Sequence, residues 1–127
     1  MRIFKSKVFN RFARKAGLVD SALRKSILKA GRGLIDADLG GGVIKQKVAR
    51  PGEGQSGGFR TIILFRAKDR AVFVYGFGKN ERDNIRDDEL TEFKNLAALM
   101  LAYSDDEIAR AIERGALIEV SDEQTVS

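Results

Sequence analysis

Two apolar segments separated by a short polar turn constrain the fold of this chain more than any other feature. Residues 59–66 and 71–77 are rich in Ile, Val and Phe, and Lys68 and Asp69 lie between them. Segments of this length and composition are typical of β-strands. Because so short a connection cannot hold the crossover that parallel pairing needs, the two strands are predicted to form an antiparallel hairpin.

A third strand is predicted before this hairpin. Residues 44–48 follow three consecutive glycines and alternate between two faces, which places Lys45 and Lys47 on the same face. Residues 50–58 hold the only proline and four glycines, so they are predicted to form a loop. The glycine spacing fits a dinucleotide-binding fingerprint, but a strand follows where that fingerprint needs a helix. The three strands therefore form an antiparallel meander.

Helices are predicted before and after the meander in the sequence. Residues 2–4 are expected to form a short strand, and apolar side chains recur at helical spacing after Ser6 and after Asp20, each a suitable N-cap residue. A third amphipathic helix is predicted from about Asp87, and a capping box at Ser104 begins a fourth. The expected fold is α+β, with two N-terminal helices packed on a small antiparallel sheet (β-α-α-β-β-β) and followed by C-terminal helices.

The chain of 127 residues is expected to hold one main domain, residues 1–103, and an acidic helical extension, residues 104–127. No segment approaches the roughly 20 apolar residues of a membrane span, and the N-terminus lacks the apolar run of a signal peptide. We expect a cytoplasmic protein with no membrane partner.

The composition excludes several kinds of chemistry. The chain has no cysteine and no histidine, which excludes disulfides, thiolate nucleophiles, the serine–histidine triad and the usual zinc or iron ligands. The carboxylates of residues 87–89 and 105–107 lie at predicted helix N-termini, where negative charge is favourable. We expect no metal and no cofactor, so any catalysis must use Lys, Arg, Glu, Asp, Tyr or Ser.

Positive charge is concentrated in the first two thirds of the chain. Residues 1–82 carry 19 basic and 6 acidic residues, whereas residues 83–127 carry 4 and 12. This asymmetry is typical of a domain that binds a phosphate backbone, although any single lysine is equally explained by a solvated sheet face. With helices on one side of the sheet, the other side is expected to present Lys45, Lys47, Arg60, Arg66, Lys79 and Arg82.

Two short motifs resemble a known family. Gly58-Phe59-Arg60 opens the second strand of the meander, and Gly78-Lys-Asn-Glu-Arg82 ends the third. With the order of elements, they make residues 2–100 resemble the RelE/ParE superfamily, most closely its RelE and HigB-like toxins. The resemblance implies a type II toxin–antitoxin toxin, a metal-free mRNA interferase that cleaves messages, in many members on the ribosome, and so inhibits translation and arrests growth. It also implies a cognate antitoxin, expected to be a DNA-binding repressor encoded beside it.

The resemblance also implies roles for individual residues. Attack of a ribose 2′-hydroxyl on its own 3′ phosphate needs a base, cations for the transition-state charge and help for the leaving oxygen. Lys45 and Lys47 match a Lys-x-Lys pair of the family and receive the base or electrostatic role, and Arg60 receives the transition-state phosphate. Arg82 or Arg86 gives a supporting contact, and Glu81 either orients Arg82 or acts as base.

Further residues are expected to contact RNA. Tyr75 offers a ring for base stacking, although a tyrosine on a central strand is also typical of a core. The chain departs from the family pattern at two positions. Asn80 stands where the family's loop motif has an arginine, and Arg86 stands where the family has a tyrosine at the start of its last helix. The expected RNA contacts are Arg50, Arg66, Tyr75, Lys79, Asn80 and Arg86.

Two other classes of function fit the same sequence. A ParE-like toxin has this fold, inhibits DNA gyrase and needs no RNA-cleaving residues, which is compatible with Asn80. A plain RNA-binding module would show the same charge distribution, since fold does not fix function. A cleavage assay on ribosomes and a gyrase supercoiling assay separate the two toxins.

Overall fold

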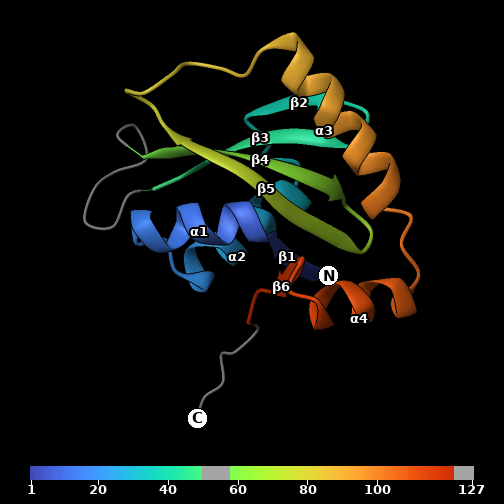
Figure 1. Ribbon diagram of the computed structural model, residues 1–127. Helices are drawn as coiled ribbons and strands as arrows, with labels where there is room; N and C mark the ends of the chain where they lie inside the picture. The colour runs from blue at the N-terminus through green and yellow to red at the C-terminus, as the bar shows by residue number, and fades with distance from the viewer. Residues whose placement is uncertain (50–57, 122–127) are drawn as a thin grey trace.

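The computed structural model (Figure 1) is described here for residues 1–49 and 58–121. These residues form four helices and six strands, and two helices lie between the first two strands in the sequence. In order, they are β1 (Arg2–Ser6), α1 (Lys7–Ala16), α2 (Asp20–Gly31), β2 (Ala37–Gly40), β3 (Val43–Val48), β4 (Phe59–Arg66), β5 (Arg70–Gly78), α3 (Asp87–Met100), α4 (Asp105–Glu113) and β6 (Leu117–Glu119).

The six strands form one sheet in the order β2-β3-β4-β5-β1-β6. The predicted meander of β3, β4 and β5 is antiparallel and confirmed. The prediction of a wholly antiparallel sheet is wrong, because β1 pairs parallel to β5 with Ile3 opposite Ala71. The chain that separates these two strands is long enough to allow parallel pairing. The strands β2 and β6 were not predicted; they extend the sheet at its two edges.

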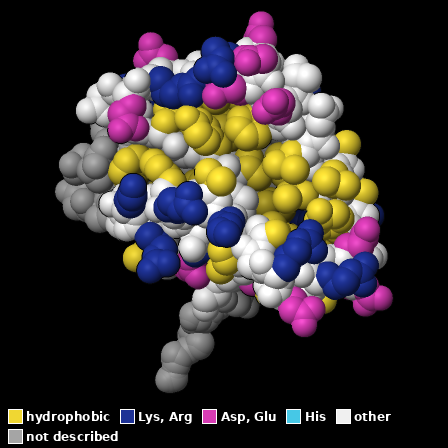
Figure 2. Space-filling model, viewed as in Figure 1, with side chains coloured by type: hydrophobic (Ala, Val, Ile, Leu, Met, Phe, Trp, Pro, Cys, Tyr) yellow, Lys and Arg dark blue, Asp and Glu magenta, His cyan; other side chains and the backbone are white. Residues whose placement is uncertain are grey.

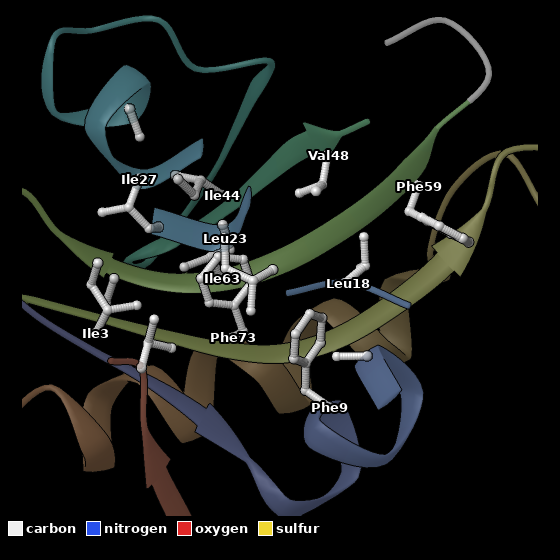
Figure 3. Close-up of a cluster of buried hydrophobic side chains, with 14 residues drawn as sticks. Ile3, Phe9, Leu18, Leu23, Ile27, Ile44, Val48, Phe59, Ile63 and Phe73 are labelled. Carbon is white, nitrogen blue, oxygen red and sulfur yellow. The ribbon is translucent and has the colours of Figure 1, made fainter. Parts of the chain in front are cut away.

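Helices cover both faces of the sheet (Figure 1). On one face, α1 and α2 bury Phe9, Leu23 and Ile27 against Ile63 and Phe73, as Figure 3 shows. On the other, α3 and α4 bury a second cluster. The expectation of one uncovered face is therefore wrong, because the strands are apolar on both sides and each side needs a cover.

The second cluster contains apolar residues that alternate with those of the first. Ile62 and Leu64 of β4 and Val72 of β5 point to this side, where Ala97 of α3 and Ile108 of α4 meet them. All five side chains are at most 1 % exposed. The face that carries Lys45 and Lys47 is thus partly occupied by helices.

The first helix begins and ends as the sequence predicts. Ser6 Oγ accepts a hydrogen bond from the Phe9 N–H at 3.1 Å, and Gly17 ends α1 with a positive φ of 73°. Asp20, predicted to cap α2, instead forms an ion pair with the buried Lys5 at 2.9 Å and accepts the Ser121 N–H. The N-cap of α2 is Val19, which has no side-chain oxygen to offer.

The buried Arg70 fixes the end of α3 on the sheet. Its Nη1 donates hydrogen bonds of 3.0–3.3 Å to the backbone carbonyl oxygens of Met100, Leu101 and Tyr103. These carbonyl groups lack partners within the helix, so the guanidinium caps its C-terminus. The predicted capping box at Ser104 then begins α4.

After α4 the chain returns to the sheet, where β6 pairs with β1. The segment that follows Ser104 therefore contributes an edge strand to the same sheet as the rest of the chain, while a boundary at residue 103 stays a prediction. No helix in the described part of the chain is both long and apolar enough to span a bilayer.

Candidate nucleic-acid interface

Three predicted cations lie side by side on adjacent strands. In the register of the sheet, Lys47 lies opposite Arg60, and Arg60 lies opposite Phe77. Lys45 is two residues away on β3, so its side chain projects from the same face as that of Lys47. We call Lys45, Lys47 and Arg60 the cationic cluster.

A β-bulge brings Tyr75 to this face. Ile62 of β4 pairs with Tyr75 of β5, but the next residue of β4, Ile63, pairs with Phe73. Val74 is therefore an extra residue on β5, which makes a β-bulge. Phe73 belongs to the core under α1 and α2, and both Val74 and Tyr75 belong to the core on the opposite face. Without the bulge, alternation from Val72 would place Tyr75 on the opposite face of the sheet.

The Gly58-Phe59-Arg60 motif has a physical explanation in the start of β4. A Cβ atom on Gly58 would lie 2.3 Å from the Val48 carbonyl oxygen, so only glycine permits this close approach of β4 to β3. Phe59 is buried edge-on against Phe12, with ring centroids 5.5 Å apart. Arg60 then points to the other face, into the cationic cluster.

Arg60 is held in an unusual state for an arginine. Its Nη1 atom is buried and has no hydrogen-bond partner among the residues that the structure describes. A buried donor without an acceptor costs about 1–3 kcal/mol, and more when the group is charged. At least one N–H group of the guanidinium therefore lacks an acceptor among the described residues.

Arg82 shows the opposite arrangement. Its Nη2 lies 2.6 Å from Glu89 Oε1, its Nη1 donates to the Tyr75 hydroxyl at 3.0 Å, and its Nε donates to the Asn84 carbonyl oxygen. The guanidinium also lies over the Phe77 ring at 5.6 Å. These contacts fix Arg82 in place and leave its charge balanced by Glu89.

The pKa of Glu89 reflects this pairing. The hydrogen bond from Arg82 and then the backbone N–H of Arg86 lower the pKa of the Glu89 carboxyl group from 4.5 to about 2. Arg86 adds a second ion pair, with Asp88 at 3.0 Å. Asn84 was not singled out in the sequence, and Glu89 was interpreted there only as a carboxylate at a helix N-terminus. The Glu89 carboxylate does accept the Arg86 N–H at 2.7 Å, which is one half of a capping box.

The loop that follows β5 is stabilised by its own residues. Glu81 Oε1 accepts the Gly78 N–H at 3.0 Å, so the carboxylate closes the turn and the ion-pair partner of Arg82 is Glu89. Lys79 and Asn80 are exposed in the same turn. Nearby, Lys45 Nζ donates to Asn84 Oδ1 at 3.3 Å, which links β3 to this loop.

Two of the predicted RNA contacts are not part of the cationic cluster. Arg66 forms an ion pair with Asp69 at 2.7 Å at the other end of β4, about 20 Å along the strand from Arg60. Arg50 lies outside the described residues. The structure thus brings Lys45, Lys47, Arg60, Tyr75 and Arg82 together and leaves Arg66 at a distance.

Positive charge is also found on the other side of the sheet. Figure 2 shows a row of basic side chains along α1, below an apolar area over β5 and α3. The row comprises Lys7, Arg11, Arg14 and Lys15. The expectation that the cations concentrate on one sheet face is therefore incomplete.

Ion pairing divides the predicted site residues into two groups. Within residues 1–49 and 58–121, Arg66, Arg82 and Arg86 have carboxylate partners, while Lys45, Lys47, Arg60 and Lys79 have none. In the same residues, no group of acidic side chains is arranged to hold a metal ion. The cationic cluster offers hydrogen-bond donors and uncompensated positive charge, which suit a phosphate group.

The fold and the site define a small α+β protein with an unpaired cationic cluster at one end of a mixed sheet. The sequence profile described as the RelE toxin of the RelE/RelB toxin–antitoxin system matches residues 1–120, from β1 through β6. The chain belongs to this family of toxins, which act within a system that also contains an antitoxin. No curated protein matches its sequence.

Proposed function

We propose that this toxin is a metal-free endoribonuclease that cleaves messenger RNA at the cationic cluster. The reaction joins the ribose 2′-oxygen to the adjacent phosphorus and releases the 5′-oxygen of the next nucleotide. A base removes the 2′ proton, and cations stabilise the additional negative charge of the transition state. The family assignment supports the toxin role, and the cluster supports the chemistry.

The buried Nη1 atom of Arg60 is the observation that carries this proposal. A buried guanidinium nitrogen without an acceptor is destabilising unless a ligand supplies one, and a guanidinium matches two phosphate oxygens in geometry and charge. Lys47 lies directly opposite Arg60, and no carboxylate among the described residues pairs with either. A phosphate placed between them would satisfy both cations.

The other residues have supporting roles in this proposal. Lys47 or Lys45 serves as base or as a second cation, and the hydrogen bond to Asn84 fixes the Lys45 ammonium. Arg82, neutralised by Glu89, positions the Tyr75 hydroxyl rather than contributing free charge. Glu81 holds the turn that carries Lys79 and Asn80, both of which we place on the RNA strand.

The partners follow from the same chemistry. We propose that mRNA on the ribosome is the substrate, and that the cognate antitoxin inhibits the toxin by covering the cationic cluster with acidic or helical segments. This places the toxin in the cytoplasm with its substrate. Co-purification with a small neighbouring gene product, expected to be a DNA-binding repressor, is the direct check of the partner.

The test is expression of Arg60→Gln without antitoxin, beside the wild-type chain and Arg110→Gln. Arg110 is an exposed cation of α4 with no ion pair among the described residues, so it controls for lost charge. Wild type and Arg110→Gln should arrest growth and produce new transcript ends, and Arg60→Gln should do neither. Full toxicity and cleavage by Arg60→Gln would contradict the assignment. Growth arrest with intact transcripts and inhibited DNA supercoiling would indicate a gyrase inhibitor instead.

A further inference from the structure

Two adjoining hollows lie between α2 and the outer edge of β3. Their volumes are about 390 and 360 Å³, and Lys29 and Lys47 line both. Lys25 and Ser21 line the first, and Asp36 lines the second. Together they form one open groove, which we call the α2–β3 groove. Lys47 lines the groove at the sheet edge, while its side chain projects from the other face of the sheet, where the cationic cluster lies.

The groove exists because β2 is shorter than β3. The two strands pair only from Val43 to Lys45, so the edge of β3 beyond Lys45 faces α2 rather than another strand. Gln46 holds the two elements together there. Its Nε2 donates to the carbonyl oxygens of Ser26 and Leu34, each at 3.0 Å. The groove is therefore built on a fixed backbone.

Lysines outnumber acidic residues among the described residues that line the groove. Lys25 and Lys29 lie one turn apart on α2, and neither they nor the Lys47 ammonium has an ion pair within the described ranges. Like charges at this spacing slightly destabilise a helix. Asp36 is the acidic residue among the described lining residues, and its carboxylate accepts the Lys47 backbone N–H. The lysine side chains thus remain available for a polyanion.

We propose that the α2–β3 groove binds the phosphate backbone of the RNA strand where it continues beyond the cationic cluster. This inference rests on the proposed function, because Lys47 connects the two sites. Lysine ammonium groups act as mobile point charges, which suit successive phosphates of a strand without base specificity. Continuity with the cationic cluster favours RNA over an acidic protein segment as the ligand.

The test measures binding of a 2′-O-methyl oligonucleotide, which lacks the attacking hydroxyl and cannot be cleaved. Its dissociation constant is measured at several salt concentrations for the wild type, for Lys25→Gln/Lys29→Gln and for Lys7→Gln/Arg11→Gln. The α1 pair has the same spacing but lies on a different helix surface; Lys7, Arg11 and Lys25 are exposed, and Lys29 is half-buried. All four positions are on helix surfaces, and circular dichroism melting confirms that each variant is folded.

The α2 variant should bind about tenfold more weakly at low salt. Its slope of log affinity against log salt should fall by about 1.4, which is two phosphate contacts at about 0.7 each. The α1 variant should retain most of the affinity.

Equal losses in both variants would show a diffuse charge effect and overturn the inference. So would unchanged oligonucleotide binding combined with loss of antitoxin co-purification, which would assign the groove to a protein. Because the probe is not cleaved, these results are independent of whether the wild-type chain cleaves RNA.

Discussion

Arg82 and Glu89 form a two-pronged ion pair that joins the loop after β5 to the first turn of α3. Arg82 Nη2 lies 2.6 Å from one carboxylate oxygen of Glu89, and Nη1 lies 3.3 Å from the other. The same guanidinium contacts the Tyr75 hydroxyl, so one residue of the family motif orders a loop, a helix and a strand. This ion pair therefore fixes the loop after β5 next to the Tyr75 hydroxyl and the start of α3.

The ion pair predicts an acid-sensitive contribution to stability. The pKa of Glu89 is lowered from 4.5 to about 2, so the stabilisation is complete above pH 4.5 and disappears as the pH falls through about 2. Glu89→Gln should be less stable than the wild type at neutral pH, and the difference should shrink over that range. Urea denaturation at a series of pH values measures this. Glu113→Gln, an exposed change on α4, should show no such pH dependence, and a constant difference for Glu89→Gln would contradict the prediction.

Two glycines of the sheet should respond differently to the same substitution. A Cβ atom on Gly76 would lie 2.3 Å from the Phe12 ring, whereas one on Gly58 would lie 2.3 Å from a backbone oxygen. Gly76→Ala should cost about 1–3 kcal/mol of unfolding free energy, and Phe12→Leu should restore part of it by making room. Thermal or urea unfolding of the single and double variants tests the coupling.

The added methyl group of Gly58→Ala would clash with the Val48 carbonyl oxygen of the adjacent strand. This clash is with backbone, so no side chain can move aside to relieve it. We expect a loss of stability that Phe12→Leu does not relieve. The displaced start of β4 should also weaken binding of the uncleavable oligonucleotide, since Arg60 lies two residues later. Rescue of Gly58→Ala by Phe12→Leu would show that the two strands separate more easily than this contact implies.

Gln46 should be important for stability although it lies between two lysines of the site. Gln46→Leu removes the side chain that bonds the carbonyl oxygens of Ser26 and Leu34 and the Asp36 N–H, in a buried to part-buried position, which should cost about 2–5 kcal/mol. Gln46→Glu keeps the volume but faces a carboxylate toward two carbonyl oxygens, so it should also be destabilised at neutral pH. Urea denaturation compares them, and wild-type stability of both variants would refute this role.

The two kinds of lysine in the predicted site should differ in effect. Lys47 lies opposite Arg60, whereas Lys79 is exposed in the turn after β5. If the proposed function holds, Lys47→Gln should lower the cleavage rate by about 10²-fold or more, and Lys79→Gln by only a few-fold. Single-turnover cleavage of ribosome-bound message gives both rates. Equal effects would place the reacting phosphate away from the cationic cluster.

Local sequence patterns determined much of this protein. The meander of β3, β4 and β5, the helix starts at Ser6 and Ser104, and the shared face of Lys45 and Lys47 all follow from periodicity, capping and short connections, which depend on nearby residues alone. The two motifs also led to the correct family. These features needed no knowledge of the rest of the fold.

The tertiary structure decided what depends on residues far apart in the chain. Parallel pairing of β1 with β5, the strand β6 and the helices on the second face arise from long connections that the sequence does not constrain. The bulge at Val74 reverses the side on which Tyr75 lies. Ion pairing then neutralises Arg82 through Glu89, while the Nη1 atom of Arg60 has no acceptor among the described residues. The charge available to a ligand depends on which carboxylates the fold brings near each cation.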